Sequence, residues 1–296
     1  MSPKGPGLLV ASRPSPLALA QTKLVAGSLG LEGDFLVEVA NQTGPGDKER
    51  FVRGVEQAVL SGAADLGVHS AKDLPGRMTS GLVIAAVPGR ADPRDAWIGP
   101  GRSIDEIPRG ARVGTSSLRR RAQLKALRPD LEMVEMSGNV DTRLSKLGAG
   151  EADGLVLAMA GLERLGRGAE ASFVFGLDQM TPAAGQGALV VQGRINGPGL
   201  DQAREIGDDQ SLIALTAERA AVVGIGADCD SPVGFHARPV GDGLVIDGFA
   251  GISDGSVWLR DRLDGDAARP EELGRELARR MLAAGAREIL AGTVES

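Results

Sequence analysis

Short apolar runs alternate with longer amphipathic segments through the first two-thirds of the chain. Apolar runs bounded by glycine, proline or polar residues are typical of buried strands, and apolar residues at helical spacing are typical of helices. The runs predict strands at 7–12, 35–40, 64–68, 83–87, 111–114, 131–136 and 153–158. The helical spacing predicts helices from Pro16 to about Leu29, from Phe51 to Leu60, and from Ser117, Asp141 and about Ala160 onward. This order predicts α/β domains with parallel or mixed sheets.

The pattern changes after about residue 210. A helical segment at 211–223 is followed by three strand-like segments and then by a helix from Pro270 to about Leu290. The three predicted strands are Gly234–Pro239, Leu244–Ile252 and Ser256–Asp261. Consecutive strands joined by short Gly/Asp turns predict an antiparallel sheet, and therefore a separate α+β domain.

The composition excludes several classes of protein. The 296 residues are 42% hydrophobic, which is typical of a soluble globular chain of two or three domains. No apolar run reaches the roughly 18 residues of a membrane-spanning helix, and the N-terminus lacks a signal-peptide pattern. The single cysteine excludes an internal disulfide and suits the reducing cytoplasm, where we expect the protein. A net charge of −6 argues against a nucleic-acid partner.

Five arginines stand out against this acidic background because they follow predicted strands. They are Arg13, Arg119, Arg120, Arg143 and Arg164. The carboxyl ends of strands lie along one edge of an α/β sheet, so these side chains are expected to converge on an anion. The hydroxyl residues 115–117 stand at a predicted helix start, where side-chain and backbone groups favour an anion. A lone arginine at a helix start is more often a solvated surface charge, and we interpret Arg121, Lys125 and Arg128 in that way.

The run HSAKDLP at 69–75 places Lys72 next to Asp73 directly after a predicted buried strand. The two side chains could form a surface ion pair of little energetic value. Alternatively, Asp73 is a carboxylate that stabilises a developing cation and handles protons. We interpret His69 as a buried, hydrogen-bonded residue and His236 as structural.

The lone cysteine, Cys229, lies between Asp228 and Asp230. Most such cysteines are inert core residues, whereas one in a polar loop is able to act as a nucleophile or an attachment point. The chain has no second cysteine and no histidine cluster at ligand spacing, so we expect no metal site. It has neither a GxGxxG nor a Walker loop, so nucleotide cofactors lack support.

Together these motifs closely resemble the porphobilinogen deaminase (hydroxymethylbilane synthase) family of tetrapyrrole and heme biosynthesis. The resemblance runs from about Ala11 to Ala237. Besides HSAKDLP and the cysteine loop, it rests on RPSPLA at 13–18, DPRDA at 92–96, VGTSSLRRRAQL at 113–124, GNVDTRLSKL at 138–147, AGLERLG at 160–166 and PAAGQGA at 182–188.

The resemblance implies two α/β domains like those of periplasmic binding proteins, facing each other across a cleft, and a C-terminal α+β domain with a small antiparallel sheet. We expect a discontinuous first domain at 1–89 and 188–207, a second domain at 93–182 and a third at 210–296. The family precedent is a monomer with a small-molecule substrate, porphobilinogen, and no membrane or nucleic-acid partner.

The resemblance also implies the chemistry of a transferase. Cys229 would carry a dipyrromethane primer through a thioether. Four porphobilinogen molecules would condense on it head to tail with loss of ammonia, and hydrolysis would release hydroxymethylbilane. Asp73 would stabilise pyrrole N–H groups and cationic intermediates. The residues expected to bind acetate and propionate carboxylates are Arg13, Ser15, Lys72, Thr115, Ser117, Arg119, Arg120, Arg143 and Arg164.

Two departures from the family pattern keep an alternative open. Ser137 stands where the family usually has an arginine, and the segment 44–52 carries extra acids where a mobile loop is usual. The alternative is a low-activity or non-catalytic tetrapyrrole-binding protein, and the sequence leaves open whether Arg167 or Arg50 compensates for Ser137. A third interpretation, a solute-binding protein for an organic anion, leaves Cys229 and the third domain without a purpose.

Overall fold

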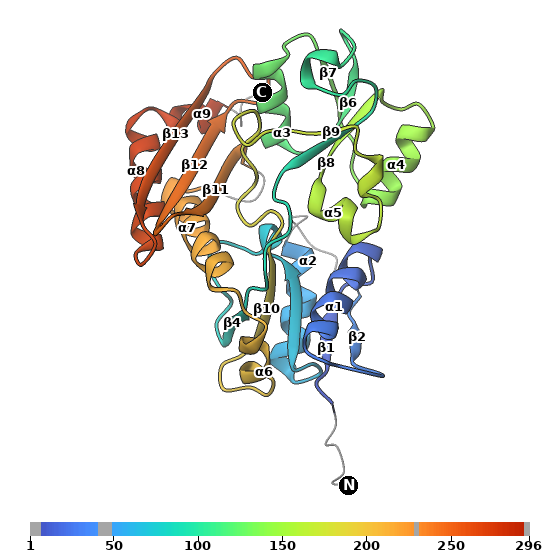
Figure 1. Cartoon of the computed structure of the whole chain (residues 1–296), viewed down its shortest axis with the longest axis vertical. Helices are drawn as coiled ribbons and strands as arrows, with labels where there is room; N and C mark the ends of the chain where they lie inside the picture. The colour runs from blue at the N-terminus through green and yellow to red at the C-terminus, as the bar shows by residue number, and fades with distance from the viewer. Residues whose placement is uncertain (1–6, 41–48, 228–230, 293–296) are drawn as a thin grey trace. The chain divides into compact units, whose positions relative to one another are not determined.

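A computed structural model of the chain describes residues 7–40, 49–227 and 231–292, with the side chains of 49–51 excepted (Figure 1). The chain divides into two compact units. The first contains the residues up to Arg90 together with Ala188–Leu212, and the second contains Ala91–Gly187 together with the residues from Ile213 onward. Each unit is described by itself.

The first unit contains a mixed five-stranded sheet in the order β2-β1-β3-β10-β4. Strands β1, β2 and β3 are parallel, whereas β10 runs antiparallel to both β3 and β4. Their bounds are β1 Val10–Ser12, β2 Leu36–Glu38, β3 Leu66–Ser70, β4 Leu82–Ala86 and β10 Leu189–Arg194. A single turn of 3₁₀ helix, Ala71–Asp73, follows β3.

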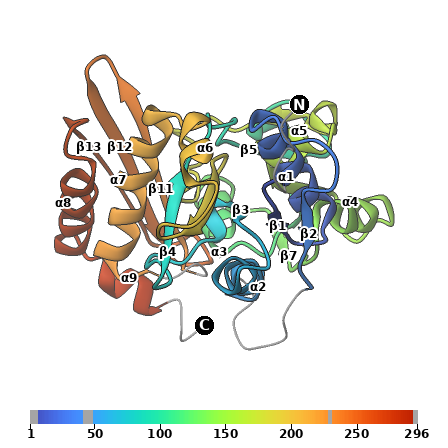
Figure 2. The same cartoon turned by 90° about the horizontal axis from the view of Figure 1, so that it is seen from below.

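Helices cover both faces of this sheet, and Figure 2 shows α1 (Pro16–Ser28) and α2 (Glu49–Ser61) on its two sides. Val25 of α1 packs with Leu66 and Val68, together with Ala203 of the short helix α6 (Leu200–Glu205). On the other face, α2 lies so close to β3 that a Cβ on Gly67 would stand 2.7 Å from Val55 Cγ1. The close approach of α2 therefore requires glycine there.

The second unit repeats this topology in a sheet of order β7-β6-β8-β5-β9. Here β6, β7 and β8 are parallel, and β5 is the antiparallel strand that occupies the place of β10. The bounds are β5 Asp95–Ile98, β6 Arg112–Gly114, β7 Glu132–Val134, β8 Gly154–Ala158 and β9 Phe173–Val174. The helices are α3 Leu118–Leu127, α4 Val140–Gly148 and α5 Met159–Arg164, with 3₁₀ turns at Ile104–Glu106 and Gly168–Glu170.

The two faces of this second sheet have separate apolar cores. Leu124 of α3 packs on one face with the fully buried Trp97 and Phe175. Leu144 of α4 packs on the other face with Met136 and Leu155, among others. Helices α3 and α4 therefore cover opposite faces.

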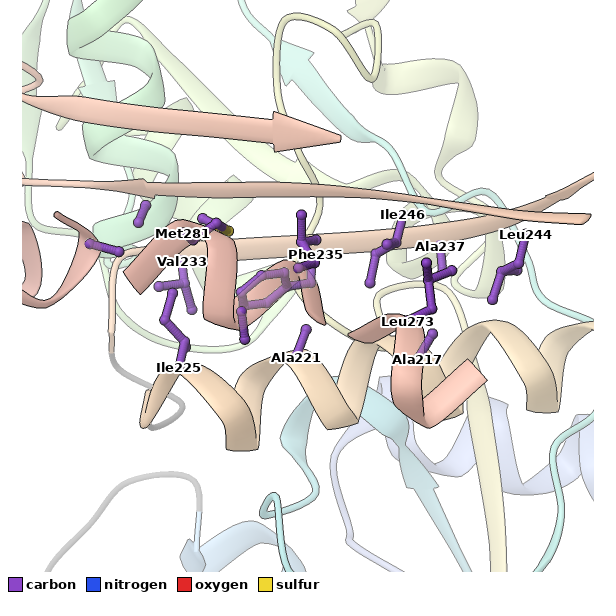
Figure 3. Close-up of a cluster of buried hydrophobic side chains, with 14 of the residues drawn as sticks. Ala217, Ala221, Ile225, Val233, Phe235, Ala237, Leu244, Ile246, Leu273 and Met281 are labelled. Atoms are coloured by element: carbon purple, nitrogen blue, oxygen red, sulfur yellow. The ribbon is translucent and has the colours of Figure 1, made fainter. Parts of the chain in front are cut away.

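A third, antiparallel sheet of order β11-β12-β13 also belongs to the second unit. Its strands are β11 Val233–Val240, β12 Gly243–Gly251 and β13 Trp258–Asp266. Figure 3 shows its apolar face, where Phe235 and Ile246 point toward α7 (Asp209–Ile225), which contributes Ala221. Met281 of α8 (Pro270–Ala283) joins the same cluster, and a last helix, α9 (Ala286–Gly292), follows.

The α/β sheets and the antiparallel C-terminal sheet confirm the predicted fold class, and the predicted strands and helices are present with bounds shifted by a few residues. One prediction is wrong: the helix from Pro270 to Leu290 is two helices, because Gly285 adopts a left-handed φ of 99°. Three strands and one helix, β5, β9, β10 and α6, were not predicted. The three-domain boundaries stay a prediction.

The two antiparallel strands that pattern analysis missed, β5 and β10, share a feature. Each carries a fully buried polar residue, Asp95 in β5 and Gln192 in β10. A polar residue inside a short run weakens the apolar signal from which a buried strand is predicted. None of the helices within the described ranges is long and apolar enough to cross a membrane.

Candidate active site

Asp73 lies in the 3₁₀ turn at the carboxyl end of β3, and Arg13 follows the neighbouring parallel strand β1. The Arg13 Nη2 and Asp73 Oδ2 atoms are 3.8 Å apart, and both side chains are about one-fifth exposed, at 22% and 19%. Burial lowers the pKa of Arg13, and the charge of Asp73 opposes that shift. Two adjacent parallel strands thus bring together the cation and the carboxylate that the sequence separates by 60 positions.

Polar groups surround this pair. A cavity of about 10 Å³ is lined by Arg13, Ala18, Gln21, Val52, Val68, His69, Ser70 and Asp73. Lys72 is half-buried in the same turn as Asp73. Ser15 caps α1, its Oγ accepting from the N–H of Ala18 at 3.3 Å. The Ser15 hydroxyl proton remains able to donate to an anion.

His69 is buried and hydrogen-bonded, as predicted. Its Nε2 lies 3.0 Å from Gln192 Oε1, while Gln192 Nε2 donates to Glu56 Oε1 at 2.9 Å. Because the Gln192 amide donates to Glu56, its oxygen accepts from His69 Nε2–H. Burial lowers the pKa of His69 to about 4, so the imidazole is neutral at pH 7. Thr79 Oγ1 completes the network by donating to Glu56 at 2.7 Å.

In the second unit, Arg119 and Arg120 both reach the fully buried carboxylate of Asp95. Arg119 Nη1 donates to Asp95 Oδ2 at 2.8 Å, and Arg120 donates to Oδ1 through Nε at 3.0 Å and Nη2 at 2.8 Å. Gln186 Nε2 also donates to Oδ1, at 2.9 Å. Burial alone would raise the pKa of Asp95, but the two guanidinium groups lower it well below its ordinary value.

The carboxylate of Asp95 therefore fixes the positions of the Arg119 and Arg120 side chains. Arg119 Nη1 also donates to the carbonyl of Thr181, and Arg120 Nη1 donates to the carbonyl of Val156. Both side chains are about 95% buried, so this is a buried charge cluster rather than a pair of surface cations. No sequence pattern assigns a role to Asp95, although it lies in the motif DPRDA. A buried acid is the expected counterpart of buried arginines.

Arg143 differs from Arg119 and Arg120, because none of the described carboxylates is hydrogen-bonded to it. Its Nη2 donates to Ser116 Oγ at 3.2 Å, and its buried Nε has no hydrogen-bond partner among the described residues. Burial, and then the charge of Arg120, lowers the pKa of Arg143 to about 10. Arg164 donates to the carbonyl of Gly187 at 2.6 Å, and burial lowers its pKa as well. Arginine side chains stay protonated at pH 7, and among the described residues no carboxylate is hydrogen-bonded to either Arg143 or Arg164.

The hydroxyl residues ahead of α3 are positioned as the sequence predicted. Ser117 caps the helix, its Oγ accepting from Arg120 N–H at 3.4 Å, and Thr115 Oγ1 accepts from Ser117 N–H at 3.2 Å. Thr115 is fully buried. Cys229 lies outside the described residues, between α7 and β11, and so does most of the 44–52 segment.

These groups fit a ligand that carries carboxylates. Arg143 offers an unmet, buried Nε–H donor, and a planar guanidinium pairs with a carboxylate through two parallel hydrogen bonds. Arg164 is a further partly buried cation of the same unit, and Arg13 is a partly buried cation of the first unit. A dipyrromethane made of two porphobilinogen units would bring carboxylates of the kind these residues would hold.

Mixed α/β sheets with cations at the carboxyl ends of their strands define a class of anion-binding α/β proteins. Comparison with known families makes the class specific. Residues 8–201 match the family model described as porphobilinogen deaminase, dipyromethane cofactor binding domain, and residues 212–283 match the porphobilinogen deaminase C-terminal domain. The chain therefore belongs to the porphobilinogen deaminase family, an enzyme family whose cofactor is dipyrromethane, as the resemblance implied.

Named relatives support the same assignment. A porphobilinogen deaminase of Roseiflexus sp. (strain RS-1) is 44% identical over 96% of this chain and 99% of the relative. One of Thermus thermophilus is 43% identical over 96% and 98%, respectively. Among solved structures, a nutrient binding protein from Burkholderia cenocepacia bound to methionine is 12% identical, with a TM-score of 0.40 over 67% of this chain and 90% of that one.

Proposed function

We propose that the protein is a hydroxymethylbilane synthase, a transferase that condenses four porphobilinogen molecules head to tail with loss of ammonia. Hydrolysis then releases the product, hydroxymethylbilane, from the primer. The observation that carries this proposal is the Asp73 carboxylate beside Arg13, at the carboxyl end of β3, in a chain of this family. The covalent dipyrromethane supplies the primer on which the chain grows. The single cysteine, Cys229, is its proposed attachment point.

Asp73 is the proposed catalytic residue. Loss of ammonia from porphobilinogen leaves a cation, and a carboxylate that is already partly desolvated stabilises such a charge more strongly than water does. At 3.8 Å the Arg13 cation is too far from Asp73 for a hydrogen bond, so the carboxylate oxygens remain able to accept from pyrrole N–H groups. Arg13 in turn is able to hold a substrate carboxylate.

The other arginines are proposed to bind the acetate and propionate side chains. In the part of the chain that the structure describes, Arg143 and Arg164 have no hydrogen-bonded carboxylate partner, so they are the strongest candidates. Arg119 and Arg120 each use part of their donors on Asp95, so they contribute through the remaining N–H groups. Ser15, Lys72, Thr115 and Ser117 complete the proposed set. Such charged hydrogen bonds are worth about 1.5–3 kcal/mol each.

A second candidate function, a low-activity or non-catalytic tetrapyrrole-binding protein, is favoured by Ser137. Arg167 is engaged elsewhere, donating to Asp141 at 2.7 Å and to Glu170 at 2.5 Å. Lys146 Nζ lies 3.5 Å from the carbonyl oxygen of Ser137. Arg167 is therefore a poor substitute for an arginine at position 137, which leaves the second candidate open.

The intact mass of the purified protein, before and after brief exposure to porphobilinogen, tests the proposal. We expect an adduct of two pyrrole units that grows in single-pyrrole steps, and no adduct on Cys229→Ser. An adduct that never grows would favour the second candidate. Wild-type protein without any adduct, from a host that assembles the primer on a control deaminase, would overturn both. We expect a cytoplasmic monomer, in keeping with the free thiol.

A further inference from the structure

We propose that a single water molecule binds in the cavity lined by His69 and Asp73, and that His69 is a positioning residue that holds this water against the Asp73 carboxylate. The inference rests on the proposed function, because it takes Asp73 as the catalytic residue. It gives His69 a role beyond that of a buried, hydrogen-bonded side chain.

The cavity has the size and the polar lining that one water molecule needs. Its volume of about 10 Å³ is close to the roughly 10–15 Å³ that a single buried water requires. The polar or charged side chains around it come from helix α1, from the segment after β1, and from the end of β3 with the turn that follows. They are Arg13, Gln21, His69, Ser70 and Asp73. Buried waters make about three hydrogen bonds each, and this lining offers enough groups for them.

Gln21 of α1 supplies independent evidence that the cavity takes a polar occupant. The residue is only 4% exposed, yet its side-chain amide forms no hydrogen bond with another described residue. Buried amide groups are paired in the great majority of cases, either with protein or with ordered water. Because Gln21 also lines the cavity, a water in that cavity is the available partner for its amide.

The orientation of the His69 ring leaves one acceptor atom unused. The buried Glu56 carboxylate accepts from Gln192 Nε2 and from Thr79 Oγ1, so turning the Gln192 amide round would point its oxygen at a carboxylate. The Gln192 oxygen therefore faces His69 Nε2, which carries the proton. Nδ1 of His69 is then an unprotonated acceptor, and it has no hydrogen-bond partner in the described part of the chain.

Asp73 lies close enough to His69 for one water to join them. The charges of Arg13 and Asp73 both act on the pKa of His69, and all three side chains line the same cavity. A water that donates one proton to His69 Nδ1 and the other to Asp73 uses both of its O–H groups, and its oxygen accepts from the Gln21 amide. These contacts fix the direction of the Asp73 carboxylate, whose remaining lone pairs stay able to accept from pyrrole N–H groups.

Two substitutions in the holoenzyme separate the two sides of the His69 ring. His69→Gln keeps an amide N–H donor for Gln192 but loses the acceptor toward the water, whereas His69→Asn keeps an acceptor near the place of Nδ1 but loses that donor. For His69→Gln we expect a kcat about tenfold lower, with KM for porphobilinogen within about twofold of wild type. For His69→Asn we expect kcat within about threefold of wild type, but a lower free energy of unfolding than that of His69→Gln.

The water itself is tested by crystal structures of the holoenzyme. We expect wild type to show one ordered water within hydrogen-bond distance of His69 Nδ1 and Asp73. Gln21→Met replaces the amide with an apolar group of similar size, so we expect it to lose this water and to lower kcat about tenfold. The matched control is Gln202→Met, the same change at an exposed position of α6, with kcat equal to that of wild type.

NMR spectra of isotope-labelled histidine nitrogens report the tautomer of His69, because the chain has only two histidines. We expect the proton on Nε2 in wild type at pH 7, and His236→Gln identifies the signals of His69. Glu56 does not line the cavity, but its charge orients Gln192. We therefore expect Glu56→Gln to mix the two tautomers and to lower kcat severalfold.

The outcomes separate the water site from the proposed function. A cavity without water in a wild-type enzyme that turns over porphobilinogen would overturn the site and leave the function standing. A kcat of His69→Gln no lower than that of His69→Asn, or a proton on Nδ1 of His69, would overturn the positioning role of His69. An ordered water at this place in a wild-type protein that does not turn over porphobilinogen would support the site and overturn the function.

Discussion

The side-chain amide of Gln123 on α3 makes two hydrogen bonds with the backbone of Thr181, Nε2 donating to the carbonyl at 3.0 Å and Oε1 accepting from the N–H at 2.7 Å. Arg119 donates to the same carbonyl, and Arg260 of β13 donates to Gln123 Oε1 at 3.1 Å. A continuous hydrogen-bond path therefore joins the C-terminal sheet to the cluster around Asp95. The C-terminal sheet and the proposed anion-binding residue Arg119 therefore share one structural support.

Gln123→Leu is expected to lower the free energy of unfolding by about 2–3 kcal/mol, because it leaves the buried N–H of Thr181 without a partner. Urea denaturation of the variant and wild type measures the loss. Gln202→Leu makes the same change at an exposed position on α6 and is expected to stay within about 0.5 kcal/mol of wild type. Equal stabilities of the two variants would show that the contacts to Thr181 contribute nothing.

Asp95→Asn is expected to destabilise the protein by about 3–5 kcal/mol, because it leaves two buried guanidinium groups without their counter-charge. The comparison variant is Asp153→Asn, which breaks an exposed pair with Arg112 and is expected to cost far less. Denaturation curves for both variants give the difference. A loss no larger in Asp95→Asn than in Asp153→Asn would contradict the role of Asp95.

The buried His69 is expected to make the free energy of unfolding depend on pH. Its folded pKa of about 4 lies below the ordinary value of 6.5, so the unfolded chain binds a proton between these values that the folded chain does not. The contribution of His69 is therefore fully present above pH 6.5 and is lost as the pH falls toward 4, by up to about 1.4 kcal/mol per pH unit. This loss reflects the burial of a neutral imidazole beside Gln192.

Unfolding free energies of wild type and His69→Gln at pH 7, 6 and 5 measure that contribution. The chain has only two histidines, so the difference in slope isolates His69. Wild type is expected to lose stability more steeply than the variant below pH 6.5. Parallel curves would mean that the pKa of His69 is the same in the folded and unfolded states, and would contradict its burial as a neutral imidazole.

The residues around Asp73 and Asp95 show what a sequence pattern is able to predict about a site. Arg13 and Asp73 each follow a recognisable strand, and the rule that strand ends meet at one edge is enough to bring them together. The serine caps of α1 and α3 follow from local chemistry in the same way.

The partners that were missed depend on contacts between distant residues. Asp95 meets Arg119 across 24 positions and Gln186 across 91, and no local pattern encodes such a pairing. Arg119 and Arg120 were expected to face a ligand, whereas much of their hydrogen bonding is directed at Asp95. Whether they also bind carboxylates stays a prediction. Arg121, which the sequence pattern suggested is a solvated surface charge, has a buried Nε atom without a hydrogen-bond partner among the described residues, and this is likewise visible only in three dimensions.

Asp73→Asn is expected to lower kcat at least about 100-fold, because the amide keeps the shape of the side chain but loses the charge that stabilises a cation. Stability is expected to change by less than about 1 kcal/mol, since Asp73 is partly exposed and its pair with Arg13 is long, at 3.8 Å. Turnover of porphobilinogen, the intact mass and urea denaturation are measured on the same preparation. Asp201→Asn, an exposed carboxylate of α6, is the matched control. A variant at position 73 with its adduct intact and kcat within tenfold of the control would refute the catalytic role of Asp73.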